Sequence, residues 1–161
     1  MALNSTIANT NIVWHGGKLL ALEEAHAPFA LDPASLMPKG YETYGDKLCG
    51  PFTAHPKIDP KTGEMVFFGY SAKGRFTKEV SIQTVTADGK VTRAEILEGP
   101  FPSMIHDFAV TKNWIVVPIF PLTSVDGARH GRQAAVRLGA RQGHAHRLHP
   151  AQRHASPTPS G

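Results

Sequence analysis

Two histidines of this chain lie where an imidazole could bind a metal ion. His55 ends the string GPFTAH and His106 lies in the string SMIHDF, so apolar residues precede both side chains. A neutral imidazole with one open nitrogen is a good ligand for iron, copper or zinc. An isolated histidine is nevertheless more often a structural or surface residue, so spacing alone does not assign a site.

Other kinds of chemistry find little support. The chain has one cysteine, Cys49, so neither an internal disulfide nor a cysteine-rich zinc site can form, which fits a reducing, cytoplasmic setting. No Gly-x-Ser-x-Gly string and no glycine-rich phosphate loop is present. The N-terminus lacks the pattern of a signal peptide, and no apolar stretch nears the length of about 18 residues that spans a membrane. We therefore expect no membrane span.

The length of 161 residues fits one ordinary domain, but charge is distributed unevenly along it. Residues 127–161 hold six Arg, five of the nine His, and no Asp or Glu. Residues 1–126 hold eleven Lys and Arg against thirteen Asp and Glu. A nucleic-acid-binding function would therefore depend on the last 35 residues alone, and we do not expect it.

Residues 127–161 also lack aromatic side chains and end in SPTPSG, which predicts a disordered basic tail. A second hypothesis is a shifted reading frame. One choice of GC-rich codons for Arg132 to Pro150, read from the second base, encodes aromatic residues, a Pro-Asp-Lys-Gly turn and an apolar strand. The DNA sequence tests this hypothesis, because codons incompatible with the second frame would exclude it.

The elements that must position the two histidines are all expected to be strands. Apolar and alternating runs predict strands at residues 12–15, 18–22, 28–31, 65–70, 80–85, 91–97, 104–110 and 114–119. Gly16-Gly17, Asp59 to Gly63 and Asp88-Gly89 are typical of tight turns. No segment shows a helical period. Short strands with frequent turns suggest a sandwich, barrel or propeller, and a spacing of roughly 50 residues per group of strands favours propeller blades.

Three strings resemble the carotenoid cleavage oxygenase family, which includes the lignostilbene dioxygenases. They are NTNIVWH at 9–15, PFTAHPKIDP at 51–60 and MIHDFAVT at 104–111. The resemblance covers about residues 9–126, and the string GEMVFFGY at 63–70 is most similar to the bacterial stilbene-cleaving branch.

The resemblance implies a seven-bladed β-propeller with iron(II) on its axis. In the family, four histidines hold the iron and leave positions open for dioxygen, and the reaction cleaves a C=C bond into two carbonyl products. By motif, His55 matches the first ligand and His106 the second. The implied substrate is a small apolar alkene, either stilbene-like or an apocarotenoid.

The resemblance also gives roles to two glutamates. Metal-bound histidines usually donate their other N–H to a carboxylate, and Glu24 matches the family glutamate that would support His106. The alternative for Glu24 is a solvated turn residue. Glu23 stands at a substrate-binding position where the stilbene-cleaving enzymes have a lysine that binds the substrate phenol. A carboxylate would repel a phenolate, so Glu23 argues against a 4-hydroxystilbene substrate.

We therefore expect an all-β chain in two parts. Residues 1–126 form a partial seven-bladed propeller of about two to three blades, and residues 127–161 form a disordered or frame-shifted basic tail. The function is that of an iron(II) dioxygenase of the carotenoid and stilbene cleavage type, truncated and with little or no activity. Two alternatives stay open: a small non-catalytic β-domain, which stoichiometric iron binding would contradict, and a nucleic-acid-binding protein that uses the tail, which salt-dependent DNA binding would support.

Overall fold

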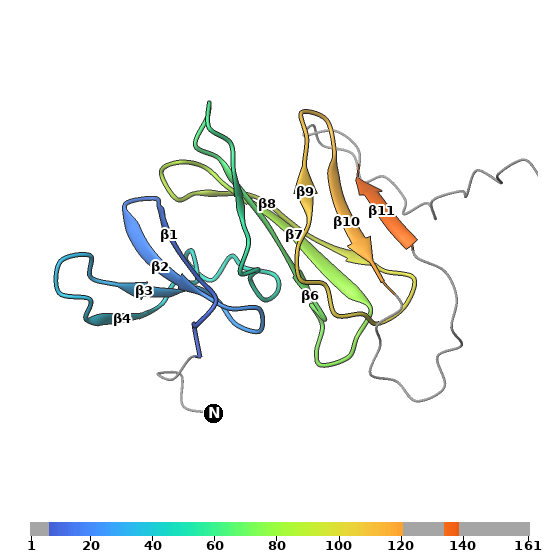
Figure 1. Ribbon diagram of the computed structural model, residues 1–161, viewed down its shortest axis with the longest axis horizontal. Coiled ribbons are helices and arrows are strands. Elements are labelled where there is room, and N and C mark those ends of the chain that lie inside the picture. Colours follow the sequence, from blue (N-terminus) through green and yellow to red (C-terminus); the bar gives the residue numbers. More distant parts are fainter. Residues whose placement is uncertain (1–6, 121–133, 139–161) are drawn as a thin grey trace, which may run out of the picture.

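The computed structural model describes residues 7–120 and 134–138, and every regular element among them is a β-strand. Figure 1 shows three antiparallel sheets that follow one another from left to right along the longest axis of the molecule. The prediction of an all-β chain is therefore confirmed for the described part. Among the same residues, nothing forms a helix with the length and apolar character needed to cross a membrane.

The first sheet is built from residues before the His55 string. Its strands, in spatial order, are β1 (Asn11–His15), β2 (Lys18–Leu22), β3 (Phe29–Leu31) and β4 (Pro38–Tyr41). The predicted Gly-Gly hairpin is present: Gly16 and Gly17 both have positive φ, and His15 pairs with Lys18. The β4 segment was not predicted, because its sequence PKGY contains two residues that are poor strand formers.

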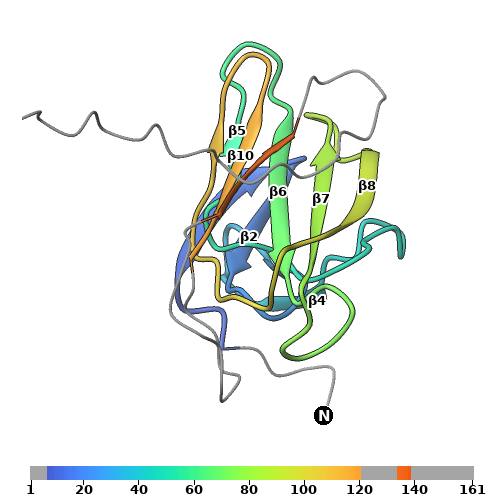
Figure 2. The ribbon, with the colours of Figure 1, turned by 90° about the vertical axis from the view of Figure 1, so that its right-hand side faces the viewer.

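The second sheet lies in the middle of the molecule and carries its longest strands. These are β5 (Lys57–Ile58), β6 (Met65–Tyr70), β7 (Glu79–Val85) and β8 (Val91–Glu98), in that order. Figure 2 shows β6, β7 and β8 side by side. The Asp88-Gly89 hairpin turn is confirmed, with Gly89 at φ 85° and the N–H of Gly89 bonded to the carbonyl of Thr86. The turn at Asp59 to Gly63 is confirmed by the bond from the Gly63 N–H to the Asp59 carbonyl.

The third sheet consists of β9 (Ala109–Val110), β10 (Ile115–Ile119) and β11 (Ala134–Leu138), with β10 in the middle. The strand predicted over residues 104–110 is much shorter than expected, since only its last two residues pair. The range 127–161 was expected to be a tail, but five of its residues form β11, which pairs with β10 over its whole length. The other residues of that range lie outside the described part of the chain.

The core consists of two apolar layers on opposite faces of the middle sheet. Because side chains alternate along a strand, β6 sends Met65 and Phe67 to one face and Val66 and Phe68 to the other. The first pair joins Leu20 and other residues of the first sheet, and the second pair joins the residues of β10. Burial on both faces explains why β6 is almost continuously apolar.

Candidate metal centre

The segment that carries His55 crosses closely over β6. A Cβ placed on Gly69 would lie 2.1 Å from the carbonyl oxygen of Pro51, so only glycine allows this approach. Phe52 is buried, with its ring 3.9 Å from that of Phe67. The Thr53 hydroxyl accepts the N–H of His55 at 3.1 Å. These contacts fix the backbone of His55 two residues before β5 begins.

The segment that carries His106 is irregular and lies three residues before β9. Its neighbours Ile105 and Phe108 are buried in the core between the second and third sheets. The Ser103 hydroxyl donates to the carbonyl of Phe120 at 2.6 Å, which ties the segment to the end of β10. With its neighbours anchored inward, His106 projects outward, and its side chain is 68% exposed.

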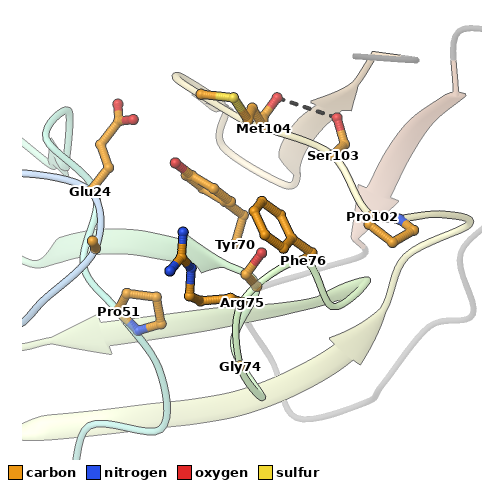
Figure 3. Close-up of a pocket in the computed structure, with 11 residues that line it drawn as sticks. Glu24, Pro51, Tyr70, Gly74, Arg75, Phe76, Pro102, Ser103 and Met104 are labelled. Atoms are coloured by element: carbon orange, nitrogen blue, oxygen red, sulfur yellow. Dashed lines mark hydrogen bonds between the residues drawn. The ribbon is translucent and has the colours of Figure 1, made fainter. Parts of the chain in front are cut away.

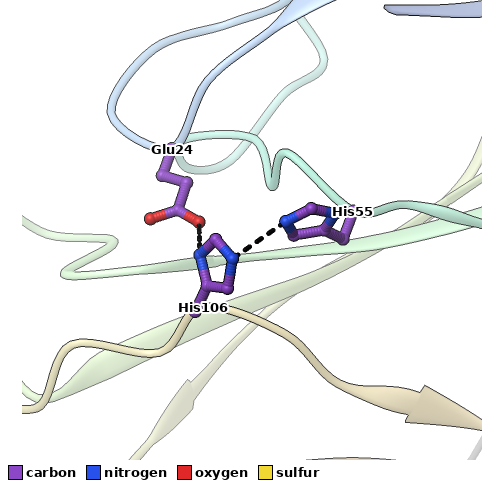
Figure 4. A group of neighbouring side chains, drawn as sticks. All are labelled: Glu24, His55 and His106. Carbon is purple, nitrogen blue, oxygen red and sulfur yellow. Dashed lines mark hydrogen bonds and ion pairs between the residues drawn. The ribbon is translucent and has the colours of Figure 1, made fainter. Parts of the chain in front are cut away.

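The structure brings the two predicted ligands together, with the Nε2 atoms of His55 and His106 3.0 Å apart (Figure 4). Two imidazole nitrogens, each about 2.1 Å from one ion and at right angles, would lie about 3.0 Å apart. The pair therefore has the separation of two neighbouring ligands of a single divalent cation, so the residues present fit a metal ion.

Glu24 lies on the other side of the His106 ring. Its Oε1 atom is 2.5 Å from Nδ1 of His106, while Nε2 of that ring faces His55 (Figure 4). The three side chains offer ligand atoms that all lie within 4.8 Å of one another. A carboxylate at this position can hold the His106 ring through Nδ1 while Nε2 faces His55.

One arrangement of the protons that fits this geometry has both imidazoles neutral. Nδ1 of His106 donates to the Glu24 carboxylate, so a neutral His106 presents a lone pair at Nε2. The 3.0 Å contact between the two Nε2 atoms then needs one proton, which a neutral His55 supplies from its own Nε2. A cation bound between the rings would displace that proton, because a ligating nitrogen must be unprotonated.

An ion pair links the first residue of β5, Lys57, to Asp107 in the irregular segment that carries His106. The Lys57 ammonium lies 2.7 Å from the Asp107 carboxylate and 5.4 Å from the centre of the Phe108 ring. Burial alone would raise the pKa of Asp107, but the hydrogen bonds from Lys57 and from the N–H of Phe108 hold it below its usual value. Both partners are substantially exposed, so the pair adds at most about 1 kcal/mol to stability.

Glu23, unlike the adjacent Glu24, does not face the two histidines. Its side chain is buried, with a relative exposure of 5%, and its carboxylate accepts the N–H of Ala25 and pairs with His26. Lys18, the cation closest in sequence, is paired with Glu42. Glu23 therefore closes the turn after β2 and has no contact with His55 or His106.

Sequence reasoning did not find a cavity that adjoins this centre. It has a volume of ≈ 430 Å³, and Figure 3 shows it between Glu24 on one side and Ser103 and Met104 on the other. Tyr70, Arg75 and Phe76, from the end of β6 and the loop that follows, also line it. Because this cavity is formed by the end of a strand and by separate loops, it leaves no periodic signal in the sequence.

Comparison with known proteins places the chain in a family. The family described as retinal pigment epithelial membrane protein matches residues 2–158. Isoeugenol monooxygenase from Pseudomonas nitroreducens is 44% identical over 123 residues, which is 76% of this chain and 26% of that protein. Resveratrol cleavage oxygenase 1 from Aspergillus fumigatus is 50% identical over 115 residues, 71% of this chain and 23% of that protein.

Solved structures of oxygenases are similar to this chain as well. The lignostilbene dioxygenase of Pseudomonas brassicacearum matches with a TM-score of 0.77 and 35% identity over 86% of this chain and 31% of its own. The cobalt-substituted apocarotenoid oxygenase of Synechocystis matches with a TM-score of 0.73 and 27% identity over 92% and 35%.

The chain belongs to the carotenoid cleavage oxygenase family, and its three sheets are blades of a partial seven-bladed β-propeller, as the motifs predicted. It spans about a quarter of the length of the curated relatives it matches. The family, the all-β fold and the propeller class are therefore confirmed.

Proposed function

We propose that this chain contributes half of the iron(II) centre of a dioxygenase that cleaves a C=C bond into two carbonyl products. His55 and His106 are the two proposed ligands, and Glu24 is the carboxylate that orients His106. The observation that supports this most directly is the 3.0 Å separation of the two Nε2 atoms, with Nδ1 of His106 already bonded to Glu24.

The side chains of the site hold and orient; they cannot activate oxygen themselves. Bound iron(II) would supply the redox chemistry with dioxygen that no described side chain has. Glu24 keeps the proton of His106 on Nδ1, and the buried neighbours of His106 keep its ring turned toward His55. The proposed substrate is an apolar alkene, because the relatives are named for isoeugenol, resveratrol and carotenoid substrates.

We further propose that the isolated chain has little or no activity. The described residues bring two imidazoles together, whereas the family resemblance implies four, and His106 is largely open to water. The single cysteine fits our proposal of a reducing, cytoplasmic setting. Neither alternative function is favoured by a contact among the described residues, and the basic tail lies mostly outside them.

Metal titration of the purified chain under anaerobic conditions tests the proposal. Calorimetry with Fe²⁺, and with Co²⁺ as a spectroscopic probe, should give one ion per chain, lost in His55→Ala and in His106→Ala but retained in His15→Ala. His15 is a suitable control because its imidazole bonds to the Gly63 carbonyl. Equal metal binding in all four proteins would overturn the assignment of ligands. Turnover of a stilbene or apocarotenal by the iron-loaded chain would overturn the expectation of inactivity.

A further inference from the structure

The cavity beside the candidate metal centre has the character of a site for an aromatic molecule. Its volume of ≈ 430 Å³ is within the range of small-molecule sites. The rings of Tyr70 and Phe76 and the thioether of Met104 line it. Glu24 also lines it and is bonded to His106, so the cavity adjoins the centre directly.

Only two of the residues that line this cavity are charged, Glu24 and Arg75. They differ in whether they have an ionic partner. The Glu24 carboxylate is bonded to His106. Arg75 forms no ion pair with a carboxylate among residues 7–120, and its guanidinium carbon lies 5.3 Å from the centre of the Phe76 ring. Burial, with smaller effects from Glu24 and Glu23, raises the pKa of Tyr70, so its hydroxyl remains a donor. The cavity therefore offers an unpaired cation and a phenolic donor in aromatic surroundings.

The neighbouring charged groups already have partners. The buried carboxylate of Glu23 is bonded to Ala25 and His26. Lys18 is paired with Glu42. Arg75 is thus the cation that the structure offers to a molecule in the cavity.

We propose that this cavity binds an aryl alkene that carries a carboxylate, with Arg75 as the residue that determines this specificity. The alkene part of this inference rests on the proposed function. A guanidinium group presents a planar fork of N–H donors that matches a carboxylate in two parallel hydrogen bonds, which a lysine cannot do. The carboxylate of Glu24 repels a second carboxylate, so the acid end of the ligand is oriented toward Arg75 and its apolar part toward Glu24 and Met104.

The test compares two planar ligands of nearly the same shape, para-carboxystilbene and its neutral para-carboxamide. Stilbene fluorescence and calorimetry report their affinities for the full chain in the presence of a metal chelator. The wild-type chain should prefer the carboxylate by about fivefold, the upper effect of a charge pair that is open to solvent. Arg75→Gln should abolish the preference and Arg75→Lys should retain part of it. Lys73→Gln is the matched control, since Lys73 lies in the same loop without lining the cavity.

The outcomes separate this inference from the proposed function. An equal affinity of the wild-type chain for both ligands, or an equal loss of preference in Arg75→Gln and Lys73→Gln, would overturn the role of Arg75. Binding of neither ligand would overturn the cavity as a site. His106→Ala should lose metal binding yet keep the carboxylate preference. If His106→Ala instead keeps metal binding, the assignment of His106 as a ligand fails while the role of Arg75 is unaffected. Circular dichroism of each variant shows that it is folded.

Discussion

Replacement of Glu24 gives the most direct test of how the candidate centre is held. Glu24→Ala removes the acceptor of the Nδ1 proton of His106, whereas Glu24→Gln removes the charge but keeps a carbonyl acceptor. Loss of such a supporting carboxylate typically weakens metal affinity by about 10-fold to 100-fold. Glu24 is 22% exposed and His106 68%, so water screens the pair and places the effect near tenfold, or about 1.4 kcal/mol.

The assay is the displacement of Co²⁺ by a chelator of known affinity, followed by the visible bands of the bound ion. We expect the order wild type, Glu24→Gln, Glu24→Ala from tightest to weakest. Asp88→Asn is a matched control, because Asp88 is an exposed carboxylate paired with Lys90 in a distant hairpin. Wild-type affinity in Glu24→Ala would refute the argument, since the short bond to His106 would then have no influence on the ligand.

Three further predictions concern stability. Phe67→Ala should lower the free energy of unfolding in urea by about 3–5 kcal/mol, because the side chain is fully buried between the first two sheets. Gly69→Ala should destabilise the chain and weaken metal binding together, because the new methyl group would collide with the segment that leads to His55. A hydrogen bond from the backbone of Ser35, with others from the same turn, lowers the pKa of Asp32. The free energy of unfolding that the wild-type chain gains over Asp32→Asn should therefore be full at neutral pH and decline below about pH 4. Urea unfolding of both proteins across the acid range measures this difference.

How much the sequence could predict depends on how local each feature is. The Gly16-Gly17 and Asp88-Gly89 turns were predicted correctly, because a tight hairpin needs positive φ at defined positions. Residues 104–108 were wrongly expected to be a strand, since their apolar run is anchored by separate core contacts of Ile105 and Phe108. The β4 segment pairs only because the edge of β3 is available, which no local pattern reveals.

The candidate site itself was accessible to sequence reasoning only through the resemblance. His55 and His106 come from segments that precede strands of different sheets, and their contact depends on the stacking of those sheets. No periodicity encodes that stacking. The ionic link between Lys57 and Asp107 was also missed, because Asp107 falls in residues 104–110, which were expected to form one strand, whereas only Ala109 and Val110 pair.

The position of the histidines links metal binding to the packing of the middle and third sheets. The His55 segment lies against β6, and the residues beside His106 fill the core under β10, where the Phe68 and Phe108 rings are 5.0 Å apart. An ion held by both imidazoles would bind only the folded arrangement and so stabilise it, by about 2.7 kcal/mol at a free concentration one hundred times the Kd. By the same linkage, any loss of packing between these sheets separates the ligands and weakens the site, even when both histidines are intact.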